Sequence, residues 1–176
     1  LNTTAMPGAI LQMLSHGLMT ALFFALIGMI YGRTHTRDIR EMGGLMKIMP
    51  FLGVCYMIAG FASLGLPGLS GFVAEMTIFF GSFQHTDLFH RAFVIAGTSA
   101  IVVTAVYILR VVGKILLGPV QDEHHLQLTD ATWFERLSTV TLIICIAAIG
   151  CFPNWINETI QQSFAPIIKV IEQAAI

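Results

Sequence analysis

Long stretches without a formal charge constrain this chain more than any other feature of its sequence. Residues 8–31 contain no Asp, Glu, Lys or Arg. As a helix they would be about 36 Å long, enough to cross the hydrocarbon core of a bilayer, which is about 30 Å thick. Apolar stretches also cover residues 137–152 and residues 93–117, the latter with Arg110 and Lys114 near its end. The sequence therefore predicts an all-α membrane protein, a bundle of transmembrane helices.

Composition excludes several other classes of protein. Only 11% of the residues are charged, compared with about 25% in soluble domains. The net charge of −1 leaves no basic surface for nucleic acid, so we expect no nucleic-acid partner. The three cysteines lie in apolar stretches, without the spacing of a disulfide framework or a metal site. We find no motif for a nucleotide, flavin, haem or iron–sulfur cluster and expect no cofactor or metal in this chain.

Residues 50–84 are apolar but are interrupted near residues 65–71. The sequence GLPGLSG places Pro67 among three glycines. Proline removes a backbone donor and glycine tolerates non-helical angles, so a continuous helix is disfavoured there. The stretch is either two short crossings or one discontinuous crossing made of two halves.

The placement of Lys and Arg favours the single discontinuous crossing. It puts most basic residues on one side, as expected of a cytoplasmic face, whereas two crossings would spread them more evenly. The basic side would carry Arg33, Arg37, Arg40, Lys47, Arg110, Lys114 and Arg136, and the other side Arg91 and Lys169. We predict a bundle over residues 1–153 with about four crossings, at about 8–31, 50–84 (broken near 65–71), 93–117 and 137–152. The loop at residues 32–48 is then cytoplasmic.

The tail, residues 154–176, has a different pattern. Its large apolar side chains recur at helical spacing, and its charged side chains fall between them. This pattern predicts a C-terminal amphipathic helix on the surface of a membrane or a partner, with Pro166 kinking it or starting it afresh. Within the bundle, small residues recur every fourth position and predict helix contacts. These stripes are Gly17, Ala21 and Ala25, and Ala96, Ala100 and Thr104.

Glu75 is the main candidate functional residue. It is the only acid between residues 43 and 86, and it follows the predicted helix break. Burying an ionised side chain at bilayer depth costs roughly 2.5–3.5 kcal/mol, and intramembrane acids usually serve a function. Transporters place discontinuous helices at their ion sites. We expect Glu75 to take up and release protons; a purely structural role, paired to a cation or capping the break, is the alternative.

His16 is the second candidate, within the first crossing. A histidine titrates near neutral pH and can relay protons, or it can be a core residue bonded to a backbone carbonyl. Neighbouring polar residues such as Gln12 and Ser15 could hold water along a path, although such side chains often bond only their own helix. His124 and His125 form a weak metal signal because no third ligand accompanies them.

Three segments make the sequence recognisable: GAILQMLSHGL, YGRTHTRDIREMGGL and ASLGLPGLSGFVAEMTIFFGSF. Together they resemble the chain M subunits (chain 4 in mitochondria) of respiratory complex I, the proton-pumping NADH:quinone oxidoreductase. The HTRD loop and the GLPG-x-x-GF-x-x-E motif are the most specific features. Family members are longer, with fourteen crossings that include two inverted repeats, and this chain is similar to the last four.

The resemblance implies that Glu75 is the key acid of the broken helix in the second repeat and that His16 belongs to the central polar axis. It also implies that the tail braces neighbouring subunits. The family's other essential groups, a glutamate and lysines of the first repeat, have no counterpart in this sequence, so a complete proton channel needs the longer chain.

The resulting hypothesis is a proton-translocating membrane subunit that couples electron transfer from NADH to quinone to proton pumping, without a redox site of its own. Its partners would be other membrane-arm subunits, the lipid bilayer and protons. It would lie in a bacterial inner (plasma) membrane, or in the mitochondrial inner membrane of a eukaryote. The alternatives are a subunit of a multisubunit cation/proton antiporter or membrane-bound hydrogenase, and a non-conducting scaffold.

Overall fold

The computed structural model describes the backbone of residues 4–84 and 86–174, and the side chains of these residues except 165 and 167–174. Regular structure in this part of the chain is helical throughout. The elements are α1 (Ala5–Thr34), α2 (Leu45–Ile48), α3 (Pro50–Ser63), α4 (Ser70–Phe83), α5 (Leu88–Leu116), the 3-10 helix η1 (Glu123–Gln127), α6 (Trp133–Cys151) and α7 (Asn154–Ala174). Among them α1, α5 and α6 are long and apolar enough to cross a membrane.

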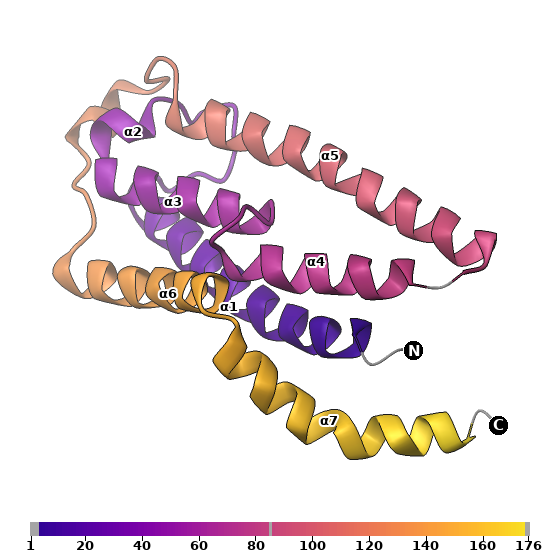
Figure 1. Ribbon diagram of the computed structural model, residues 1–176. Coiled ribbons are helices and arrows are strands. Elements are labelled where there is room, and N and C mark those ends of the chain that lie inside the picture. Colours follow the sequence, from indigo (N-terminus) through magenta and orange to yellow (C-terminus); the bar gives the residue numbers. More distant parts are fainter. Residues whose placement is uncertain (1–3, 85, 175–176) are drawn as a thin grey trace.

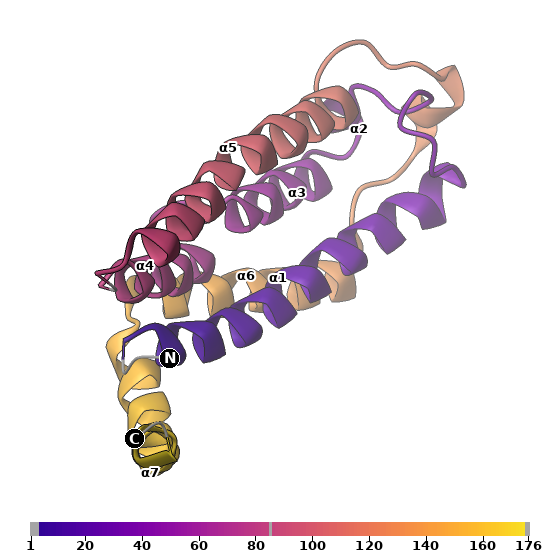
Figure 2. The same cartoon turned by 90° about the vertical axis from the view of Figure 1, so that its right-hand side faces the viewer.

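The helices α3 and α4 together supply the remaining crossing. Each contains 14 residues and is therefore about 21 Å long, too short to span a core of about 30 Å alone. They lie roughly end to end beside α5, joined by residues 64–69 (Figures 1 and 2). The predicted fold class, an all-α membrane bundle with one discontinuous crossing, is confirmed.

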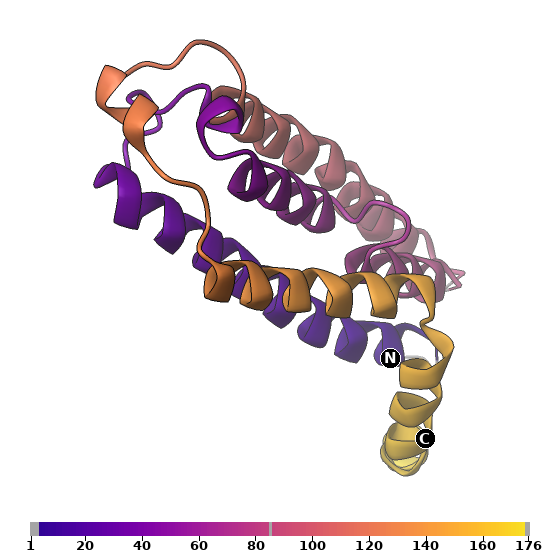
Figure 3. The same ribbon diagram turned by 90° about the vertical axis from the view of Figure 1, so that its left-hand side faces the viewer.

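The crossings alternate in direction and so divide the bundle into two ends. Residues 35–44 and 117–132 meet at one end, which we call the loop end (Figure 3). The start of α1, the end of α4 and the start of α5 lie at the opposite end, which we call the tail end because α7 leaves the bundle there (Figure 1). This arrangement gathers on the loop end the basic residues that the sequence assigns to one side.

Helix bounds differ from the apolar stretches that predicted them. α1 extends beyond both ends of residues 8–31. α5 begins before residue 93, because the Asp87 carboxylate caps it by accepting a hydrogen bond from the backbone N–H of His90 (3.1 Å). α6 begins before residue 137, because Thr132 and Glu135 form a capping box. Polar caps start helices ahead of their apolar parts, which a search for uncharged stretches misses.

The most extensive helix pair is α1 with α4, and glycines bring the two backbones together. A β-carbon placed on Gly81 would lie 2.5 Å from the backbone nitrogen of Ala5, and one on Gly8 would lie 3.0 Å from that of Ile78. Residues without a β-carbon allow such close approach. The α1–α4 interface therefore depends on glycines at the tail end.

The predicted small-residue stripes were wrong as markers of contacts within this chain. Gly17 has no atom near its missing β-carbon, Ala21 is exposed, and so are Ala96 and Ala100 on α5. α1 and α5 are apolar around most of their circumference, so spacing alone does not tell which face turns inward.

A dense polar network holds the loop end. The Arg33 guanidinium at the end of α1 binds the Glu135 carboxylate at both oxygens, with N–O distances of 2.6 and 3.1 Å. It also donates to the backbone carbonyls of Met29 (2.9 Å), Thr129 (2.8 Å) and Asp130 (3.2 Å). This network joins α1 to α6 and lets α1 continue past its apolar part.

The side chain of Asp130 extends the network to α3. Its carboxylate accepts hydrogen bonds from the backbone N–H groups of Phe51 (2.8 Å) and Leu52 (3.3 Å). These two groups belong to the first turn of α3, where intrahelical acceptors are missing. A residue 79 positions away in sequence therefore caps this helix.

At the tail end, α7 begins next to the bundle. Ile156 and Ile160 pack against the cluster formed by Leu11, Ala74 and Ile149. α7 continues through Pro166 rather than starting afresh, and it bends partway along its length (Figure 1). The predicted apolar face beyond residue 166 involves side chains outside the described ones, and residues 175 and 176 lie outside the described backbone.

Candidate functional site

The helix break, residues 64–69, is built from backbone conformations that suit its sequence. Gly65 and Gly68 have φ angles of 62° and 92°, in the left-handed region that glycine adopts without steric cost. Pro67 between them has no N–H to continue a helix. The N–H of Leu66 turns back to the carbonyl of Phe61 (3.2 Å). The break therefore has a fixed conformation set by glycine and proline.

Glu75 directs its carboxyl group at this break. Helical side chains lean toward the N-terminus of their helix, so Glu75 reaches back over the first turn of α4. A β-carbon on Gly65 would lie 2.6 Å from Glu75 Oε2, which places the carboxyl directly against the Gly65 backbone. The residue is half-buried. Within the described residues Glu75 forms neither an ion pair nor a side-chain hydrogen bond, in contrast to the paired carboxylates at the loop end.

A buried pair of serines connects the break to α1. The hydroxyl oxygens of Ser15 and Ser70 are 2.6 Å apart, and both residues are buried. Ser70 is the first residue of α4, so this hydrogen bond fixes the start of α4 against the middle of α1. Sequence reasoning found Ser15 as a polar residue but missed Ser70, because the partner 55 positions away leaves no local signal.

The end of α6 supports the break from another side. A β-carbon on Gly150 would collide with the backbone of Gly68 and Leu69, so α6 touches the break through a glycine. The Cys151 thiol lies 3.5 Å from the carbonyl oxygen of Gly68 and donates to it. The break is thus enclosed by α1 and α6 while Glu75 lies on its α4 side.

His16 is not brought together with Glu75 in this chain. It is exposed on α1, next to the buried Ser15, and no hydrogen bond or ion pair joins it to Glu75 in the part of the chain that the structure describes. Gln12 lies one turn before His16. Its Oε1 atom is buried without a hydrogen-bond partner among the described residues, an unusual state for a buried acceptor.

The weaker sequence signals do not converge on a second site. Among the described residues no group of three or more His, Cys, Asp or Glu side chains is placed to hold a metal ion. His125 is buried in the loop end, whereas the adjacent His124 is exposed. Cys55, Cys145 and Cys151 are all free thiols.

Fold and site together define a class of membrane protein: a helix bundle in which one discontinuous crossing carries an acidic side chain at its break. Comparison with known proteins specifies the family. Residues 1–104 match the family model described as NADH:quinone oxidoreductase/Mrp antiporter, transmembrane. The chain belongs to this family.

Curated relatives include NAD(P)H-quinone oxidoreductase chain 4 proteins of cyanobacteria. One from Synechococcus sp. (strain JA-3-3Ab) is 36% identical over 179 residues, covering 98% of this chain and 33% of the relative. One from Nostoc sp. is 38% identical over 173 residues, covering 96% of this chain and 31% of the relative. The chain thus spans about one third of the length of these relatives.

Solved structures share the fold. Respiratory complex I from Thermus thermophilus contains a chain that matches with a TM-score of 0.78 at 23% identity, covering 91% of this chain and 33% of that chain. The membrane-bound sulfane sulfur reductase, an archaeal respiratory membrane complex, matches with a TM-score of 0.70 at 27% identity, covering 82% of this chain and 23% of that chain. The fold of this chain therefore occurs within larger respiratory membrane assemblies.

Proposed function

We propose that this chain is part of a proton-translocating membrane subunit of an NADH:quinone oxidoreductase, in which Glu75 takes up and releases a proton. Family membership and the chain 4 relatives support this proposal. Electron transfer would take place in other subunits, so this chain needs no redox cofactor. Its partners would be neighbouring membrane-arm subunits, in a bacterial inner membrane.

One observation carries the proposal: the Glu75 carboxyl, without a partner among the described residues, lies against the interrupted backbone of a membrane-spanning segment. Non-helical backbone at membrane depth is tolerated inside a protein or beside a water-filled cavity. A carboxyl at such a place can exchange its proton with water or with a second group. Because no cation neutralises Glu75 in the described residues, its charge can change without breaking a salt bridge.

In this proposal His16 relays protons. It lies on the exposed side of α1, so its partners would come from outside the described residues. It would accept a proton on its free ring nitrogen and release one from the other. A His16→Gln variant should therefore slow proton uptake without changing the amount of assembled subunit.

The principal test uses the full-length protein carrying Glu75→Gln, assembled in inverted membrane vesicles. Amide and carboxylic acid have similar shapes, but only the acid can transfer a proton. We expect NADH-driven proton uptake and quinone reduction to fall together, about tenfold or more, with assembly intact. Glu123→Gln is the matched control, because Glu123 is exposed in the 3-10 helix at the loop end; it should leave both rates unchanged.

The same vesicles separate this function from its main rival. The family description names Mrp antiporters as well as quinone oxidoreductases, and the archaeal reductase shares the fold. If NADH drives no proton uptake even in the wild type, while a sodium gradient drives proton movement that Glu75→Gln abolishes, a cation/proton antiporter or hydrogenase-like assembly is the better assignment. Wild-type rates in Glu75→Gln would instead indicate a scaffold without an ion path.

A further inference from the structure

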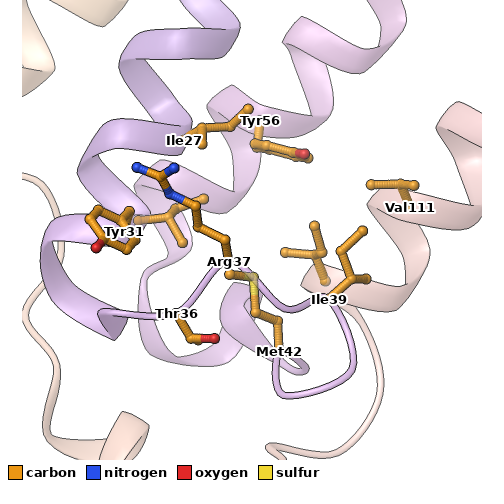
Figure 4. Close-up of a pocket in the computed structure, with 10 residues that line it drawn as sticks. Ile27, Tyr31, Thr36, Arg37, Ile39, Met42, Tyr56 and Val111 are labelled. Carbon is orange, nitrogen blue, oxygen red and sulfur yellow. The ribbon is translucent and has the colours of Figure 1, made fainter.

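A second feature of the molecule lies away from the break, at the loop end of the bundle. An apolar cavity of about 210 Å³ opens between α1, α3 and α5 beneath residues 35–44 (Figure 4). Its walls include Ile27, Tyr31, Tyr56, Val111 and Ile115. Pockets that hold whole drug-sized ligands measure about 300–1,000 Å³. This cavity is smaller and takes one part of a molecule, such as a single hydrocarbon chain.

The positions of its lining residues along α1 place the cavity near the membrane surface. α1 has 30 residues and is about 45 Å long, close to the thickness of a bilayer with its headgroup regions. Tyr31 lies within one turn of the end of α1, where interfacial tyrosines are enriched. Ile27 lies one turn deeper. The cavity therefore extends from headgroup level into the first part of the hydrocarbon region.

Arg37 is the charged side chain that lines this cavity. Its guanidinium lies over the ring of Tyr31, 4.5 Å from the ring centre, and its side chain runs from the loop along α1 (Figure 4). Within the described residues Arg37 has no acidic partner and no side-chain hydrogen bond. Arg37 is exposed, so its N–H donors are accessible to an anion, which they would bind by charge-assisted hydrogen bonds.

The acids nearest to Arg37 in the sequence have other partners. The acid next in sequence, Asp38, binds Arg40 at N–O distances of 2.8 and 3.1 Å. That hydrogen bond lowers the pKa of Asp38 to about 2, so Asp38 is ionised and is paired with Arg40 rather than with Arg37 in this structure. Glu41 accepts a hydrogen bond from Thr36 (2.5 Å). Arg37 therefore keeps its donors for a ligand, in a region already rich in Lys and Arg.

From this geometry we propose that the cavity binds an anionic phospholipid, with one acyl chain between α1, α3 and α5 and the phosphate on Arg37. Guanidinium matches phosphate by paired N–H···O bonds. Basic sites between transmembrane helices on the cytoplasmic side are suited to anionic headgroups. The tyrosine ring holds the guanidinium at the level where a phosphate lies, while the apolar walls accept the chain below it.

Photo-crosslinking of lipid to the full-length protein in its assembled complex tests this proposal. The complex is placed in nanodiscs of phosphatidylcholine containing a trace of diazirine-labelled phosphatidylglycerol, or of phosphatidylcholine bearing the same labelled chain. Labelled peptides are found by mass spectrometry. Both headgroups carry a phosphate, but the choline ammonium neutralises that of phosphatidylcholine, whereas phosphatidylglycerol keeps a net negative charge opposite Arg37. We therefore expect phosphatidylglycerol to label the cavity walls about tenfold more than phosphatidylcholine.

Variants of the cavity and its loop test which side chains cause the preference for phosphatidylglycerol. Arg37→Gln should reduce phosphatidylglycerol labelling about tenfold, to the level of phosphatidylcholine. Arg40→Gln, an arginine in the same loop that already has an acidic partner, should leave it unchanged. Val111→Trp fills the cavity and should remove wall labelling by both lipids; the yield of assembled complex shows whether each variant is folded.

Three results would overturn the proposal. Equal labelling by the two lipids would show unselective contact with the bilayer. An equal loss in Arg37→Gln and Arg40→Gln would show diffuse attraction by the loop end rather than a bound phosphate. Absence of wall labelling by either lipid in the wild type would show that protein, from the rest of a longer chain or a neighbouring subunit, covers the cavity. None of these readouts depends on proton transfer through Glu75.

Discussion

The loop end and the helix break handle charge in opposite ways. At the loop end, Arg33 binds both oxygens of Glu135 and three backbone carbonyls. At the break, the Glu75 carboxyl lies against Gly65 without a partner in the described residues. Paired charges connect helices and stabilise a fold, whereas an unpartnered acid at membrane depth is costly and is retained for function. We therefore expect stability to depend mainly on the loop end, and the proposed proton transfer to depend on the break.

Removing the Arg33 side chain from the loop-end network should have the largest effect on stability. Arg33→Ala removes the ion-pair partner of Glu135, which keeps only its hydrogen bonds from Thr132 among the described residues. In the intact pair the Arg33 side chain is 13% exposed and the Glu135 side chain is 27% exposed. Removing one partner of such a pair should cost about 3 kcal/mol. The measurement is the midpoint of thermal denaturation of the full-length protein in detergent, compared with the wild type.

Arg40→Ala is the matched control for that experiment. Arg40 also binds a carboxylate, Asp38, but its side chain is 83% exposed, and exposed pairs contribute little. Its midpoint should equal that of the wild type. Equal midpoints for Arg33→Ala and Arg40→Ala would mean that the loop-end network does not hold the helices together.

Gly150 tests the packing that encloses the break and should give the second-largest effect. In Gly150→Ala the new methyl group meets the backbone of Gly68 and Leu69, which cannot move aside as a flexible side chain would. Overpacking of this kind costs about 1–3 kcal/mol. Gly17→Ala is the control, because open space surrounds Gly17. A denaturation midpoint for Gly150→Ala equal to that of Gly17→Ala would contradict the close contact of α6 with the break.

These two regions also differ in how far the sequence predicts them. The break follows from a local pattern, since proline and glycines interrupt an apolar stretch, and Glu75 stands out as the single acid nearby. The loop end does not follow from a local pattern, because Arg33 and Glu135 are 102 positions apart and Asp130 caps a helix 79 positions away. Nothing in a local pattern pairs such residues. Likewise, uniformly apolar helices gave no basis for predicting that Gly17 and His16 would lie on the exposed side of α1.

A substitution at Gly65 acts directly on the Glu75 carboxyl. A side chain at φ 62° costs about 1–2 kcal/mol in backbone strain, and in Gly65→Ala the methyl group would also displace the Glu75 carboxyl. Gly68→Ala carries similar strain at φ 92°, but its β-carbon has open space. Both variants should lose similar stability, yet only Gly65→Ala should reduce NADH-driven proton uptake in inverted vesicles. Equal rates of proton uptake in Gly65→Ala and Gly68→Ala would mean that the position of the carboxyl is unimportant.

The Ser15–Ser70 hydrogen bond should give the smallest effect, and it tests whether the start of α4 is tied to α1. Ser70→Ala leaves the buried Ser15 hydroxyl without its partner. That hydroxyl can turn to a carbonyl of its own helix, so the cost should be only about 1 kcal/mol. Ser138→Ala removes an exposed serine that bonds only its own helix and should change nothing.

A double-mutant cycle on the full-length protein then separates the hydrogen bond from general packing. Replacing both serines leaves no unsatisfied hydroxyl, so Ser15→Ala/Ser70→Ala should cost less than the sum of the single changes, by about 0.5–1 kcal/mol. Additive costs would mean that the two hydroxyls are not coupled. The start of α4 would then be positioned by packing, and the weak thiol hydrogen bond from Cys151 would be the remaining side-chain polar contact of the break among the described residues.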